Sequence, residues 1–111
     1  MKIKELNDIL GMELLTECPD CDVQNAYTSD LLSDVMGNAP DDSALITIQA
    51  HKNTIAVASL AGINAVILCN NRKPPEDMLP AAEKENIAIL STEMNQFEAS
   101  IAVGRALNLC G

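Results

Sequence analysis

The 111-residue sequence contains few aromatic residues, few basic residues and only one histidine. Aromatic residues make up 2% of it: Tyr27 and Phe97 are the only examples, and tryptophan is missing. A core without large rings must be built from aliphatic side chains and alanine. Such a composition favours close packing of helices on a sheet over a β-sandwich built around aromatic rings.

Basic residues are outnumbered by acidic ones. Seven lysines and arginines face 16 aspartates and glutamates, which gives a formal net charge of −9. A field of that sign repels nucleic acid and anionic membrane surfaces. Arg72 and Lys73 are the only adjacent basic pair. The composition therefore predicts neither a nucleic-acid partner nor a membrane partner.

Long hydrophobic runs are missing as well. Residues 54–69 form the longest mostly apolar stretch, which is shorter than a membrane span and is interrupted by polar residues and a glycine. The opening segment, MKIKELNDILGMELL, has acidic interruptions and no apolar region typical of a signal peptide. These features predict a cytoplasmic protein, in which the four cysteines are thiols.

What the sequence does contain is an apolar fraction of 48%, enough for a core within one domain of this length. Its second half alternates two kinds of pattern. Strands are predicted at residues 44–49, 65–69 and 87–90, and helices at residues 53–61, 75–85 and 93–107. This alternation predicts a single α/β domain over residues 1–111, with a mainly parallel sheet of about four to five strands flanked by helices.

The first half carries shorter patterns. A helix is predicted at residues 3–10 with Gly11 at its end, strands at residues 12–16 and 23–26, and a helix ending at residue 36, capped by Thr28 or Ser29 and stopped by Gly37 and Asn38. If the strand at residues 23–26 joins the sheet in parallel, the turn after it lies at the same edge as the turns after the later strands.

Polar side chains gather where the predicted strands end. Carboxyl ends of parallel strands meet at one edge of a sheet, where ligands commonly bind. The chemistry offered there favours an uncharged or mildly basic polar ligand, or polar groups of a partner protein, over a nucleotide triphosphate. The alternative is that Ser29, Asn53 and Ser91 only cap helices. The candidate binding residues are Tyr27, Ser29, Asp30, Asp34, Gln49, His51 and Asn53.

Two segments, YTSDLLSDVM and TIQAHKNTIAVA, resemble the small bacterial DRTGG-domain proteins, and the likeness extends over residues 3–107. The segment that begins PPEDMLPAAEKENIAIL is also similar to the N-terminal domain of HPr kinase/phosphorylase. The resemblance implies a regulatory or accessory module acting through protein–protein contacts, tied to a redox enzyme or a serine-kinase signalling system. The alternative is a small-molecule sensor that binds a polar ligand at the carboxyl ends of the strands.

Catalytic motifs are missing from the sequence. Phosphoryl transfer needs a glycine-rich loop and a lysine, and no GxxxxGK[ST] string occurs among the five dispersed glycines. His51 is the only histidine, and a catalytic set would require Asp30 or Asp34 to approach it. We therefore expect a non-catalytic protein without a cofactor.

Metal binding has two weak candidates. Cys18 and Cys21 form one CxxC pair, but a tetrahedral site needs two further ligands. Asp30 and Asp34, four residues apart on a predicted helix, could offer two carboxylates to a cation; the alternative is a solvated face. The sequence predicts no metal site.

The last predicted helix carries apolar residues at helical spacing. Phe97, Ile101, Ala102 and Leu109 could form an exposed stripe, although most such stripes are core. The stripe predicts self-association as a homodimer, the commonest symmetric assembly.

Overall fold

The computed structural model describes residues 1–110. Its strands are β1 (Glu13–Leu14), β2 (Asn25–Thr28), β3 (Ser43–Thr47), β4 (Ile63–Leu68) and β5 (Ala88–Ser91). They form one sheet in the order β1-β5-β4-β3-β2, in which only β1 runs antiparallel to its neighbour. The predicted mainly parallel sheet is confirmed, and so is the adjacency of β3, β4 and β5.

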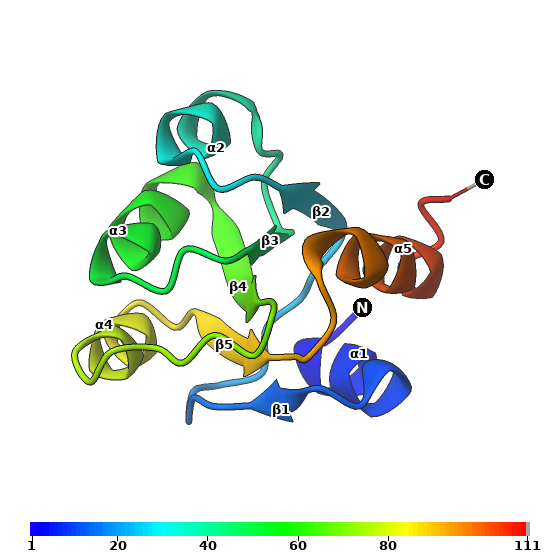
Figure 1. Ribbon diagram of the computed structural model, residues 1–111, viewed down its shortest axis with the longest axis horizontal. Helices are drawn as coiled ribbons and strands as arrows, with labels where there is room; N and C mark the ends of the chain where they lie inside the picture. The colour runs from blue at the N-terminus through cyan, green and yellow to red at the C-terminus, as the bar shows by residue number, and fades with distance from the viewer. Residues whose placement is uncertain (111) are drawn as a thin grey trace.

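Two layers of helices cover the sheet. The helices are α1 (Ile3–Leu10), α2 (Leu32–Asn38), α3 (Lys52–Ala61), α4 (Met78–Lys84) and α5 (Gln96–Ala106). Helices α2, α3 and α4 cover one face, and α1 and α5 cover the other (Figure 1). Within residues 1–110, every helix is too short or too polar to cross a bilayer.

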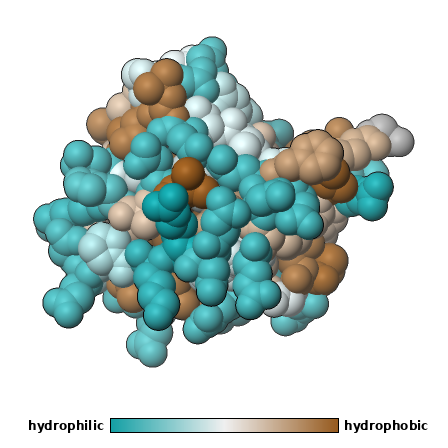
Figure 2. All heavy atoms as spheres, in the orientation of Figure 1, coloured by the Kyte–Doolittle hydropathy of each residue, from teal (hydrophilic) through white to brown (hydrophobic). Residues whose placement is uncertain are grey.

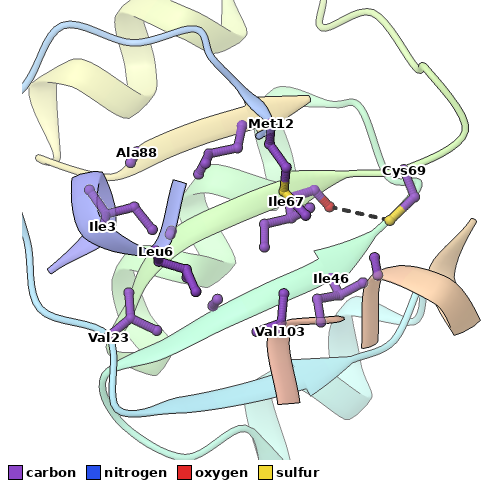
Figure 3. Close-up of a cluster of buried hydrophobic side chains, with 13 residues drawn as sticks. Ile3, Leu6, Met12, Val23, Ile46, Ile67, Cys69, Ala88 and Val103 are labelled. Atoms are coloured by element: carbon purple, nitrogen blue, oxygen red, sulfur yellow. Dashed lines mark hydrogen bonds between the residues drawn. The ribbon is translucent and has the colours of Figure 1, made fainter. Parts of the chain in front are cut away.

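Alternating side chains of the central strands feed two separate cores. On β3, Leu45 packs with the α2–α4 layer, whereas Ile46 packs with α1 and α5. Ile67 of β4 lies on the same side as Ile46, close to Leu6 of α1 and Val103 of α5 (Figure 3). All five residues of β3 are buried, as expected for a strand covered on both faces.

Several helix ends lie where the sequence predicts. Gly11 ends α1 and Gly62 ends α3, with φ values of 67° and 73° in the left-handed region, which glycine enters without the steric cost of a Cβ. Helix α4 begins at Met78 rather than near residue 75, which places Pro80 in its first turn. There the missing amide hydrogen costs no helical bond, so the proline is compatible with the helix.

The predicted caps of α2 are wrong. Strand β2 continues to Thr28, so the helix begins later, after Leu31, without a side-chain cap. The Ser29 hydroxyl accepts a hydrogen bond from the Leu31 amide (3.1 Å) and shapes the turn instead. The helix then runs through Gly37 to Asn38, since neither residue adopts a left-handed conformation there.

Asn53 and Ser91 are not caps either. His51 caps α3, because its Nδ1 accepts the Asn53 amide hydrogen (3.0 Å). Asn95 caps α5 in a capping box with Glu98, four residues beyond Ser91, which belongs to β5.

Candidate functional site

Asp30 joins three elements at the carboxyl edge of the sheet. Its Oδ1 accepts hydrogen bonds from the Thr47 hydroxyl (2.8 Å) and the Ile48 amide (3.0 Å), both at the end of β3. Its Oδ2 accepts a hydrogen bond from the Gln96 side-chain amide of α5 (3.0 Å). The carboxylate therefore holds the turn after β2 to β3 and to α5.

The charged form of Asp30 is favoured in this environment. Partial burial opposes ionisation, but the hydrogen bonds from Ile48, Thr47 and Gln96 outweigh it, with help from the positive charge of Arg72. Together they lower the pKa of the Asp30 carboxyl. Since its oxygens are occupied within the protein, Asp30 acts as a positioning residue at this edge.

The turns after β2 and β3 lie side by side, as predicted. Strand β2 pairs with β3 in parallel, which excludes the antiparallel arrangement that would separate the two turns. The Gln49 side-chain amide donates to the Asp30 carbonyl oxygen (2.9 Å). The hydroxyl of Thr54 in turn donates to the Gln49 carbonyl oxygen (2.8 Å), which ties the start of α3 to the same network.

Tyr27 and Asp34 form a second network. The Tyr27 hydroxyl donates to Asp34 Oδ2 (2.9 Å), and the Asn38 side-chain amide donates to Asp34 Oδ1 (2.9 Å). The tyrosine bond contributes most to lowering the pKa of Asp34, and the same bond raises the pKa of Tyr27. Asp30 precedes α2 instead of lying on it, so the expectation that Asp30 and Asp34 share one helix face is wrong.

His51 and Asn53 are exposed beside these networks. Capping of α3 uses His51 Nδ1 and leaves the other ring nitrogen facing solvent. Within residues 1–110, neither Asp30 nor Asp34 hydrogen-bonds to His51. Of the predicted site residues, Tyr27, Asp30, Asp34 and Gln49 are thus engaged internally, whereas His51 and Asn53 keep free polar groups.

A polar pocket of about 430 Å³ lies further along the same edge, next to β5. Consecutive left-handed residues, Asn70 and Asn71, turn the chain after β4. Their amides donate to the carbonyl oxygens of Met94 and Thr92, both at 2.9 Å, so this loop is fixed to the loop after β5. The pocket is lined by Leu10, Gly11, Met12, Glu13, Asn71, Ser91, Thr92, Glu93 and Met94.

The sequence indicates polar turns after β4 and β5 but gives no reason to expect this pocket. Its other wall comes from β1, whose antiparallel pairing sets Glu13 opposite Ser91. A two-residue strand carries too little pattern to reveal its direction or its neighbour. The pocket was therefore missed because one of its walls could not be placed from the sequence.

An open groove of about 670 Å³ runs between α3 and α4. Ile55, Ala56, Pro80 and Ala81 supply its apolar floor. Lys52, Asn53, Asp77, Lys84 and Glu85 complete its lining. The groove lies beside the carboxyl edge, since Lys52 and Asn53 begin α3 at the end of the turn that follows β3.

The cysteines are free thiols in different environments. Burial, followed by the charge of Cys18, raises the pKa of Cys21 to about 11. Burial, followed by the charge of Asp30, raises the pKa of Cys69 to about 11. Among residues 1–110, neither Cys18 nor Cys21 belongs to a group of three or more potential metal ligands.

These environments predict the order of cysteine alkylation. At pH 8, Cys110 is exposed and should react first with iodoacetamide, whereas Cys21 and Cys69 should react last because few of their thiols are ionised. Mass spectrometry of peptides from the native protein measures the order. Labelling of Cys21 as fast as that of Cys110 would show that the loop before β2 is not packed as described.

No family model and no curated protein matches this chain. Among solved structures, it is similar to the CBS and DRTGG domains of the regulatory region of Clostridium perfringens pyrophosphatase, determined in complex with the activator diadenosine tetraphosphate. The match has a TM-score of 0.71 and 14% sequence identity, and it covers 94% of this chain and 46% of that chain. The chain thus has a DRTGG-like fold and spans less than half the length of this structural relative.

Proposed function

We propose that this chain is a non-catalytic regulatory domain that senses a small polar ligand in the pocket beside β5. The pocket itself carries the proposal, because it lies at the carboxyl edge of a parallel sheet, the usual ligand-binding edge in α/β folds. Its walls are held by the backbone bonds between the loops after β4 and β5. An open pocket whose walls are already held in place can bind a ligand without first ordering a loop.

The lining of the pocket indicates the class of ligand. Glu13 and Glu93 supply carboxylates, and none of the lining residues is lysine or arginine. Within residues 1–110, the Ser91 hydroxyl and the Asn71 side-chain amide make no hydrogen bond, so both are available to a ligand. These groups suit a neutral or positively charged polar molecule, such as an amine that also carries hydroxyl groups.

The regulatory role draws support from the fold. The structural relative is the regulatory region of a pyrophosphatase with an activator bound. That activator carries a chain of four phosphates, which the two glutamates of the pocket would repel. We therefore propose a similar role with a different ligand.

Contact with a partner protein is the second candidate function. The groove between α3 and α4 favours it, because its apolar floor with charged residues around it suits a side chain or helix of another protein. By resemblance, the partner is a redox enzyme or a serine-kinase signalling protein. Sensing and partner contact are compatible, since the groove and the pocket use different residues.

A thermal-shift screen tests the sensing function. A ligand at about 100 times its Kd stabilises the folded state by about 2.7 kcal/mol, so binding raises the melting temperature. We expect polar amines or polyols to raise it and nucleotides to leave it unchanged. Glu93→Gln should weaken the shift caused by an amine. Glu76→Gln is the matched control, because Glu76 is exposed and lies outside the pocket. A shift produced only by nucleotides, or equal effects of the two variants, would contradict the proposal.

A further inference from the structure

Strand β2 leaves one edge of the sheet open. In a parallel pair, alternate residues direct both backbone groups to the neighbouring strand. The amides of Asn25 and Ser29 donate to carbonyl oxygens on the β3 side, so odd-numbered residues of β2 face β3. Ala26 and Thr28 therefore direct their amides and carbonyls outward, where the described residues 1–110 provide no further strand.

This open edge lacks the charges and prolines that commonly protect edge strands from pairing. Natural edge strands are commonly blocked by charges, prolines, bulges or very short length. The opposite edge, β1, has only two residues and one of them is Glu13. By contrast, residues 23–29 contain neither a charged residue nor a proline, although the chain as a whole carries a charge of −9.

Exposed hydrophobic side chains flank the carboxyl end of β2 on both faces of the sheet. Leu31 is 64% exposed beside α2, and Phe97 is 74% exposed on α5. Leu31 follows Asp30 in the chain, and Phe97 follows Gln96. Because Asp30 and Gln96 are hydrogen-bonded to each other, Leu31 and Phe97 both lie next to this end of β2. Phe97 also lies one turn before Ser100, whose hydroxyl is 2.7 Å from that of Thr28.

Two more exposed hydrophobic residues lie towards the other end of β2. Helices α2 and α5 both start at the carboxyl edge and run back along the sheet (Figure 1). Met36 lies in the second half of α2, and Leu109 follows the end of α5; both are exposed. Figure 2 shows hydrophobic residues over α2 and over α5, with neutral and some hydrophilic residues between them at the top of the molecule.

We propose that β2 pairs antiparallel with β2 of a second copy of this chain, so that two sheets join into one. A two-fold axis between the two strands, perpendicular to the sheet, sets Ala26 opposite Thr28 of the partner copy, and the outward backbone groups hydrogen-bond to each other. The same axis brings Phe97 towards the partner's Leu109, and Leu31 towards the partner's Met36. The strand is uncharged, so pairing at this edge sets no like charges directly opposite each other although the chain as a whole is acidic.

The occupant is a second copy because the edge is complementary to itself. Each of the flanking helices carries an exposed hydrophobic residue near both of its ends, and antiparallel pairing exchanges those ends between the copies. An unrelated extended peptide would satisfy the strand but would leave all four of these residues in water. The interface is distinct from the ligand pocket, which lies at the β1 side of the sheet.

Sedimentation equilibrium over a micromolar concentration series tests the proposal. We expect twice the monomer mass at high concentration for the natural chain. Phe97→Glu should raise the dimer Kd about tenfold or more, since it sets a charge in an apolar contact. Leu60→Glu is the matched control: Leu60 is 75% exposed on α3, away from β2, and should leave the Kd unchanged.

A backbone variant and an exchange measurement complete the test. Ala26→Pro removes one outward amide at a position where an edge strand tolerates proline. This variant should abolish the dimer, and circular dichroism should show that the chain is still folded. In the natural chain, NMR should show that the amides of Ala26 and Thr28 exchange more slowly as concentration rises. A monomer at all concentrations, equal effects of Phe97→Glu and Leu60→Glu, or unprotected Ala26 and Thr28 amides in a dimer would overturn the proposal.

Discussion

Replacing Asp30 with alanine should lower the free energy of unfolding by about 2–3 kcal/mol. The change removes the acceptor for the Thr47 hydroxyl, the Ile48 amide and the Gln96 side chain at once. Thr47 is fully buried, so its hydroxyl cannot turn to water for a replacement bond. Urea unfolding followed by circular dichroism measures the loss.

The Asp30 network should also make stability depend on pH. The pKa of Asp30 is lower in the folded chain, so its contribution is present above the ordinary aspartate pKa. It is lost as the pH falls through the lowered folded value. Asp30→Asn should therefore be less stable than the natural chain at neutral pH, and the gap should shrink in acid.

Asp77→Asn is the control for this experiment, because Asp77 is exposed and its side chain makes no hydrogen bond within residues 1–110. It should follow the stability curve of the natural chain. An Asp30→Asn curve parallel to that of the natural chain at every pH would show that the Asp30 charge does not hold the edge together.

Replacing Ala58 with leucine should cost about 1–3 kcal/mol, because the larger side chain cannot fit without moving the helix or its neighbours. Ala58 is completely buried where α3 packs on the sheet, among Leu45 and Val66. The control is Ala56→Leu, two residues away on the exposed side of the same helix. Thermal unfolding compares the two, and equal melting temperatures would contradict the close packing of α3.

The central strands could be predicted from sequence because their environment is uniform. Residues 44–49 are mainly apolar and residues 65–69 entirely so, and such runs indicate strands covered by helices on both sides. The edge strands gave weaker patterns: β2 lies two residues beyond its predicted position, and β1 is only two residues long. At an edge, hydrogen bonds to one neighbour decide the structure, and a sequence pattern does not record them.

The candidate site shows a different limit. The sequence correctly predicted that the turns of Asp30 and Gln49 lie together, because the carboxyl ends of parallel strands meet at one edge of the sheet. It could not show that Tyr27 and Asp34 hydrogen-bond to each other, or that Asp30 accepts its hydrogen bonds from β3 and α5, instead of facing solvent. Whether a polar group is free depends on tertiary contacts, and these leave free groups on His51 and Asn53 as well as in the pocket beside β5.

An NMR fragment screen tests the sensing function most directly. The natural chain, labelled with ¹⁵N, is titrated with small neutral, cationic and anionic polar compounds, and shifted amides are mapped on the structure. We predict that neutral and cationic compounds shift the amides of Gly11, Glu13, Asn71, Thr92 and Glu93, which surround the pocket. Binding confined to anionic compounds, or shifts confined to other surfaces such as the groove between α3 and α4, would contradict a sensor at this edge.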